Sequence, residues 1–144
     1  MGKDPLLAIV CLVELCGPSR FSHWDSGGRP VGKPHPMPWV QVAATSKEQT
    51  KNTMRMFPHV ISDRMKAEFG LDIGIEFIRT AGAKGTLEAV TSNPRTLEGG
   101  RVTFCLLNES HHWVEGNQGI QMYLTADNNA SKLGNRYLAI TNAY

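Results

Sequence analysis

The feature that most constrains the fold of this 144-residue chain is a nearly unbroken apolar run from Val102 to Leu107. A strand with one face in water alternates apolar and polar residues, whereas a strand covered on both faces of a parallel sheet is apolar throughout. The run therefore predicts a buried central strand with helices on both sides of the sheet. It ends in Asn108 and Glu109, which places two polar side chains at its carboxyl end.

Helical and strand patterns alternate along the rest of the chain. Ser46 and Gln49 have the spacing of a capping box that opens a helix, and Gly70 follows the last helical turn of that region. In chain order we expect a buried helix, a strand, a helical crossover, a hairpin laid onto the sheet edge, the apolar strand, a helix and a last strand. They cover residues 5–16, 39–44, 46–69, 73–91, 102–107, 117–133 and 137–141. This order predicts an α/β fold with a parallel sheet and helical crossovers.

Residues 18–38 are rich in Gly, Pro and Ser, and they include a Gly27-Gly28 pair. Such a composition is typical of turns and irregular connections rather than of strands or helices. We therefore expect this segment to be a flexible surface loop.

Composition limits the classes of function only weakly. The chain has 15 basic and 13 acidic residues, a net charge of +2, which is too balanced for a dedicated nucleic-acid-binding module. Its 3 cysteines are odd in number and lack the paired spacing of zinc sites or disulfide frameworks. A reducing cytoplasm suits these thiols best.

The apolar run from Leu6 to Leu15 superficially resembles a membrane segment or a secretory signal. It is far shorter than the roughly 20 residues that a spanning helix needs, and Glu14 lies within it. We therefore expect no membrane association. A secreted α/β domain with an amino-terminal signal peptide stays open as a remoter alternative.

Polar residues with possible chemistry stand where predicted strands and helices begin or end. Lys3 opens the first helix, where a lysine beside exposed backbone N–H groups can bind phosphate. Glu109 follows the apolar strand, where a carboxylate can hold a metal ion through water or orient an attacking water. His111 and His112 are expected to be structural, because adjacent side chains point in different directions.

These motifs, taken in order, resemble the ATPase domain of the large terminase subunit of tailed phages. The resemblance extends over nearly the whole chain. It is carried by Gly2-Lys3 before an apolar helix, the strand that leads into Ala44–Thr50, Asn108-Glu109-Ser110-His111-His112-Trp113, and Thr141-Asn142-Ala143.

The resemblance implies a P-loop NTPase-type parallel sheet in a motor that hydrolyses ATP with Mg²⁺ and moves double-stranded DNA into a capsid. It implies a homo-oligomeric ring, portal protein and terminase small subunit as partners, and the bacterial host cytoplasm as the location. The leading Walker A strand and the family's nuclease domain have no counterpart here. We therefore expect residues 1–144 to be a partial ATPase domain.

Carried over by position, Gly2, Lys3 and Asp4 match the nucleotide-binding segment. Glu109 matches the catalytic glutamate that orients or activates water. Thr141 and Asn142 match the coupling motif, which links hydrolysis to movement.

Two positions depart from the family pattern. Asp4 stands where a Ser or Thr usually binds magnesium, and Asn108 stands where a Walker B Asp usually does. Because Mg²⁺ is held by hard oxygens and one or two carboxylates, our hypothesis is that the carboxylate has changed sides between Asp4 and Asn108. The alternative is a non-catalytic remnant or interaction module of a split or degraded terminase gene.

Overall fold

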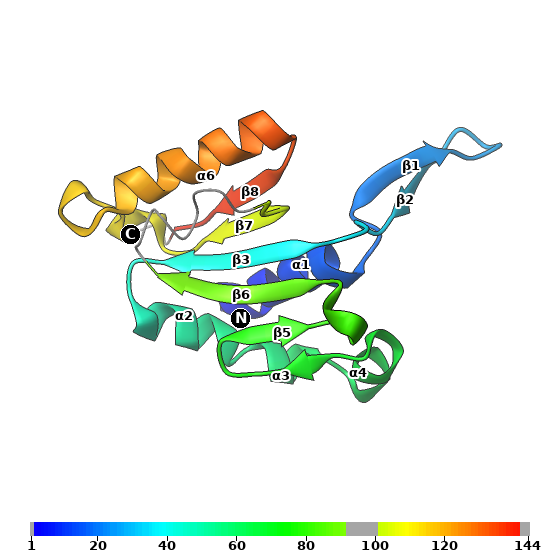
Figure 1. The fold of residues 1–144 in the computed structure, drawn as a ribbon, viewed down its shortest axis with the longest axis horizontal. Helices are drawn as coiled ribbons and strands as arrows, with labels where there is room; N and C mark the ends of the chain where they lie inside the picture. The colour runs from blue at the N-terminus through cyan, green and yellow to red at the C-terminus, as the bar shows by residue number, and fades with distance from the viewer. Residues whose placement is uncertain (1, 92–100, 142–144) are drawn as a thin grey trace.

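The computed structural model describes residues 2–91 and 101–141 (Figure 1). Its helices are α1 (Lys3–Cys16), α2 (Lys47–Met54), α3 (Phe57–Val60), α4 (Asp63–Phe69) and α6 (Gly119–Leu133), with short 3-10 turns η1 (Ala81–Ala83), η2 (Ser110–His112) and η3 (Glu115–Asn117). Its strands are β1 (Arg20–Trp24), β2 (Pro30–Lys33), β3 (Trp39–Ala44), β4 (Asp72–Ile73), β5 (Phe77–Arg79), β6 (Thr86–Thr91), β7 (Phe104–Leu107) and β8 (Arg136–Ala139).

A six-stranded sheet in the order β4-β5-β6-β3-β7-β8 forms the centre of the fold. Strands β6, β3, β7 and β8 are parallel, whereas β5 is antiparallel to both of its neighbours. The predicted α/β fold with a mostly parallel sheet and helical crossovers is confirmed. The apolar run that predicted a central strand forms β7, between β3 and β8.

Both faces of the sheet are covered by helices, as the apolar run requires. On one face Val42 of β3 and Leu106 of β7 pack in a buried cluster with Leu7 of α1. On the other face Leu107 of β7 packs with Met122 of α6. Figure 1 shows α1 and α6 on opposite sides of the strands. Alternate residues of one short strand therefore hold two helices that are far apart in sequence.

The helical crossover between β3 and β4 begins and ends where its capping residues predict. The Ser46 hydroxyl accepts a hydrogen bond from the backbone N–H of Gln49 at 3.3 Å. Gly70 ends α4 in a left-handed conformation with φ of 57°, which glycine adopts without a Cβ clash.

The predicted hairpin over residues 73–91 is formed by β5 and β6, which pair antiparallel. The hairpin joins the sheet through β6, which pairs in parallel with β3 along its whole length and so lies inside the sheet. The edge strand itself is β4, a further antiparallel neighbour of β5 that was not predicted as a separate strand. Leu87 of β6 is completely buried, which explains why a strand with weak alternation belongs in the interior.

The loop predicted over residues 18–38 is wrong in its secondary structure. Strands β1 and β2 form an antiparallel hairpin with a register shift between Phe21 and His23 (Figure 1). Most of its side chains are exposed, so the segment lacks the buried alternation by which strands are recognised. The hairpin is attached at its base, where Arg20 binds the Glu14 carboxylate of α1 at 2.8 Å.

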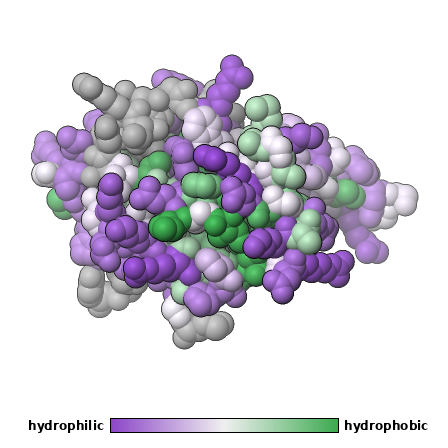
Figure 2. Space-filling model, turned by 60° about the horizontal axis from the view of Figure 1, so that its bottom comes forward, coloured by the Kyte–Doolittle hydropathy of each residue, from purple (hydrophilic) through white to green (hydrophobic). Residues whose placement is uncertain are grey.

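Several large apolar side chains are exposed, among them Leu6, Trp24 and Ile75. In Figure 2, hydrophobic side chains gather at the centre of the face shown and hydrophilic ones surround them. Among the described residues, no helix combines the length and the apolar composition needed to cross a membrane.

Neighbouring leucines in α1 test how the helix is held on the sheet. Leu7 is completely buried, whereas Leu6 is 60% exposed. We expect Leu7→Ala to lower the free energy of unfolding by about 2–5 kcal/mol, because it leaves a cavity in the core. Leu6→Ala, a matched change one residue away, should alter it by less than about 0.5 kcal/mol. Urea unfolding curves compare the two, and equal losses would contradict the packing of α1.

Candidate functional site

The amino end of α1 and the carboxyl end of β7 meet in a direct ion pair. Lys3 Nζ lies 3.1 Å from Glu109 Oε1, although the two residues are 106 positions apart. Both side chains are largely shielded from water, with exposures of 19% and 25%. The structure thus brings together the two residues that the sequence singled out for phosphate binding and for water activation.

Backbone hydrogen bonds to both neighbouring strands fix the loop that carries Glu109. The N–H of Asn108 donates to the carbonyl of Ala43 at the end of β3. The N–H of Ser110 donates to the carbonyl of Ile140, just beyond β8. Glu109 is therefore held between two anchored residues at the carboxyl edge of the parallel sheet, where ligands bind in open α/β sheets.

The second carboxylate oxygen of Glu109 is also engaged. Gln49 Nε2 donates to Glu109 Oε2 at 3.1 Å, and Thr45 Oγ1 donates to Gln49 Oε1 at 3.0 Å. His112 Nε2 lies 3.7 Å from the same carboxylate oxygen. These contacts orient the carboxylate before any ligand arrives. Gln49 was predicted only as a capping residue, and its contact with Glu109 was missed because the two are 60 positions apart.

The backbone of Glu109 is strained. Its φ of 53° and ψ of 50° lie in the left-handed region, which costs a residue with a side chain about 1–2 kcal/mol. Strained conformations of this kind occur at functional sites, where the surrounding structure imposes them. Here the fixed backbones on both sides impose the turn, and the turn directs the carboxylate toward Lys3.

Asn108 lies deeper than the other predicted site residues. It is 4% exposed, and its Nδ2 donates to Thr53 Oγ1 of α2 at 3.0 Å. Its backbone carbonyl accepts the indole N–H of Trp113 at 3.0 Å. Its Oδ1 is buried and has no hydrogen-bond partner among the described residues. An unsatisfied buried oxygen fits an added donor or cation, although the contact with Thr53 holds this side chain toward α2.

The remaining predicted positions lie at the same end of the sheet or outside the described residues. Gly2 is extended and directly precedes α1, and Asp4 lies in its first turn. Thr141 Oγ1 is 2.8 Å from His111 Nδ1, which connects a residue two positions beyond β8 to the turn that follows Glu109. Asn142 lies outside the described residues.

The two adjacent histidines differ from the expectation that they point apart. Their ring centroids are 3.9 Å apart, because both occupy the tight 3-10 turn η2 directly after the left-handed Glu109. One possible ligand atom from each of Glu109, His111 and His112 lies within 4.8 Å of the other two. The sequence-based expectation assumed a strand or an α-helix, in which adjacent side chains point in different directions, so it missed this convergence.

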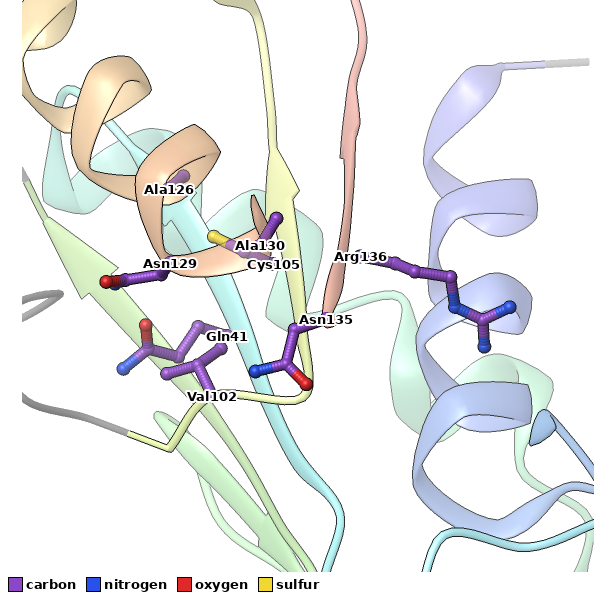
Figure 3. A pocket seen from close by; sticks show the side chains of 8 residues that line it. All are labelled: Gln41, Val102, Cys105, Ala126, Asn129, Ala130, Asn135 and Arg136. Carbon is purple, nitrogen blue, oxygen red and sulfur yellow. The ribbon is translucent and has the colours of Figure 1, made fainter. Parts of the chain in front are cut away.

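Two hollows in the described surface lie away from this cluster. A cavity of about 10 Å³, enough for about one water, lies between α6 and the sheet beside the buried Gln41 (Figure 3). In that view Arg136 points away from the cavity toward α1, where it binds Glu14. The second hollow is lined by residues at the start of β3 and β6, including Trp39 and Thr86. Both hollows therefore lie away from the Lys3–Glu109 pair.

Comparison with known proteins shows similarity to mycobacteriophage gene products. The chain is 48% identical to the "Gene 13 protein" of Mycobacterium phage L5 and 46% identical to that of Mycobacterium phage D29. Each alignment covers 99% of this chain and 25% of the relative, so the chain spans about a quarter of the length of these curated relatives. No model of a known protein family matches the chain.

Solved structures define the class of fold. The large terminase of bacteriophage HK97 matches with a TM-score of 0.66 and 16% identity over 97% of this chain and 26% of that protein. The large terminase ATPase domain of Thermus phage P74-26 matches with a TM-score of 0.65 and 12% identity over 99% of this chain and 56% of that domain. The chain has the fold of a phage large terminase ATPase domain.

Backbone strain at Glu109 generates a stability prediction. Glu109→Gly and Glu109→Ala both remove the carboxylate, but only glycine adopts the left-handed conformation without cost. We expect the Gly variant to unfold with a free energy about 1 kcal/mol greater than that of the Ala variant. At ordinary positions with negative φ the order is reversed, because glycine adds entropy to the unfolded chain. Urea unfolding distinguishes the two orders.

Proposed function

We propose that the chain is part of the ATP-hydrolysing DNA-packaging motor of a phage large terminase. The observation that carries the proposal is the Lys3–Glu109 contact, which joins a helix amino terminus to the carboxyl end of a buried parallel strand within this fold. A cation at a helix start and a carboxylate at a strand end are two of the groups that phosphoryl transfer to water uses.

Lys3 and Glu109 act in sequence on one bound nucleotide. Lys3 leaves the carboxylate for the β- and γ-phosphates, because a phosphate carries more negative charge than Glu109 and lies in the field of the α1 amino terminus. Glu109, released from its cation, then becomes a stronger hydrogen-bond acceptor for the attacking water. Gln49 continues to hold the other carboxylate oxygen and limits the directions that the carboxylate can take.

Asp4 and Asn108 are the residues that would hold Mg²⁺, which would neutralise charge on the phosphates. Asp4 supplies the carboxylate from the first turn of α1, and Asn108 supplies a neutral amide oxygen that has no hydrogen-bond partner among the described residues. One carboxylate and one amide oxygen match the preference of Mg²⁺ for few protein ligands and several waters.

Thr141 and Asn142 are proposed to couple hydrolysis to movement. Thr141 contacts His111 in the turn after Glu109, so a shift of the glutamate loop reaches the end of β8 through one hydrogen bond. Residues 1–144 are proposed as part of a motor domain that works in a homo-oligomeric ring in the host cell. Its proposed partners are double-stranded DNA, the portal protein and the terminase small subunit.

A second candidate function is a non-catalytic assembly module. It is favoured by the two departures from the terminase pattern, Asp4 and Asn108. Assays of nucleotide binding and of hydrolysis separate it from the motor, because an assembly module needs neither.

The roles of Lys3 and Glu109 predict different losses when each residue is replaced. Lys3→Ala should weaken binding of a fluorescent ATP analogue with Mg²⁺, because the main phosphate cation is gone. Glu109→Gln should keep binding but reduce hydrolysis by about 100-fold or more, since it removes a group needed only in the transition state. Lys66→Ala, an exposed lysine in α4, is the matched control. If the unmodified protein neither binds the ATP analogue nor hydrolyses ATP, the assembly module is favoured.

The exchange of the carboxylate between Asp4 and Asn108 predicts a compensating pair. Asp4→Ser alone should abolish Mg²⁺-dependent hydrolysis, and Asp4→Ser with Asn108→Asp should restore it. The Thr53 hydroxyl accepts from Asn108 and donates to the Gln49 carbonyl at 3.4 Å, and by turning its proton to the new carboxylate it would reduce the cost of burying that charge. A double variant that stays inactive, while its circular dichroism spectrum is unchanged, would refute the exchange.

A further inference from the structure

Glu109, His111 and His112 form a compact group of metal-ligating side chains. The possible ligand atoms of all three lie within 4.8 Å of one another. A glutamate with two histidines is the ligand set of three-ligand zinc sites, which leave the fourth position to water. The 3-10 turn η2 brings the two adjacent imidazole rings together.

We propose that these three residues bind a borderline divalent transition metal, of which Zn²⁺ is the type, and that the bound metal withdraws Glu109 from Lys3. Both imidazoles favour zinc over magnesium, because Mg²⁺ takes oxygen ligands. The site is thus chemically distinct from the Asp4 and Asn108 oxygens assigned to Mg²⁺. The Zn²⁺ ion bound by the turn is therefore not the metal that takes part in ATP hydrolysis.

The surroundings of the three residues suit a metal. Metal-binding histidines commonly use their other ring nitrogen for a hydrogen bond that orients the ring, and the Thr141 hydroxyl gives His111 such a partner at 2.8 Å. Gln49 likewise steadies the Glu109 carboxylate. His112 is half exposed, with 50% of its side chain in water, so an ion reaches the cluster from solvent.

Binding of the metal has a direct consequence for the proposed motor, and this part of the inference rests on the proposed function. A divalent cation on Glu109 replaces the single positive charge of Lys3 and occupies the carboxylate that would otherwise accept the attacking water. Hydrolysis should therefore fall as the site fills with Zn²⁺.

The cysteines do not offer a competing site. Burial raises the pKa of Cys16 to about 11 and that of Cys105 to about 12, and it also raises the pKa of Cys11. The thiolate is the form that binds zinc, so these three thiols are poor ligands near neutral pH. Zn²⁺ bound by this chain near neutral pH is therefore expected to be held by histidines rather than by thiols.

The test is a titration of the 144-residue chain with Zn²⁺ in competition with a chromophoric chelator, without nucleotide. We expect one Zn²⁺ per chain, unaffected by millimolar Mg²⁺. His111→Ala and His112→Ala should each weaken binding by about tenfold or more. His59→Ala, an exposed histidine on α3, is the matched control and should bind like the unmodified chain. Circular dichroism on the same samples establishes that each variant is folded.

Three outcomes would overturn the site: no Zn²⁺ bound, tight binding that survives both His111→Ala and His112→Ala, or equal weakening by His59→Ala. The consequence for catalysis is tested separately by adding Zn²⁺ to an ATPase assay of the protein. One-to-one binding without any ATPase activity in zinc-free buffer would leave the metal site standing and refute the proposed motor function. Activity that is unchanged at saturating Zn²⁺ would refute the withdrawal of Glu109.

Discussion

The rest of this structure depends on the burial of β7 from both sides. Leu106 packs toward α1 and Leu107 packs toward α6, and both side chains are completely buried. Helices must therefore cover both faces of the sheet, and the parallel neighbours β3 and β8 pair with β7 along its edges. The turn that carries Glu109 begins directly after β7, at the carboxyl edge of the sheet. The position of the charged site is thus set by an apolar strand.

The same arrangement explains why Lys3 reaches Glu109. Helix α1 is held against β7 by Leu7 and Cys11, which are completely buried on one side of the helix. Its first turn then lies beside the carboxyl edge of the sheet, so a lysine at the helix start faces the glutamate at the strand end. Apolar contacts along α1 thus determine where Lys3 lies, and the ion pair with Glu109 forms because of that position.

How much could be predicted from the sequence depends on the range of the interactions involved. The central strand, the Ser46 cap and the Gly70 helix end were predicted correctly, because each follows from residues near one another in the chain. The hairpin β1–β2 was missed because its side chains are mostly exposed and its attachment is a distant ion pair. The parallel pairing of β6 with β3 was not predicted, because paired residues such as Trp39 and Thr86 are 47 positions apart in sequence.

The candidate site shows the same division. Lys3, Glu109 and the end of β8 were singled out from local pattern and from the terminase resemblance, and the structure places them at one edge of the sheet. The contacts of Gln49, the left-handed backbone of Glu109 and the convergence of the two histidines were not predictable. Each arises from the turn that anchored neighbours impose, and no residue type in that segment signals it.

The Glu14 carboxylate of α1 binds arginines from two separate parts of the chain. Arg20 at the base of the hairpin lies 2.8 Å from one oxygen, and Arg136 at the start of β8 lies 2.7 Å from the other. With both oxygens occupied, neither arginine can move without releasing charge that is only 9% exposed. The Glu14 carboxylate thus connects the hairpin β1–β2 to the start of β8 at the amino end of the sheet. A force applied to the projecting hairpin is therefore transmitted to β8. The other end of that strand leads to Ile140, whose carbonyl accepts a hydrogen bond from the loop that carries Glu109.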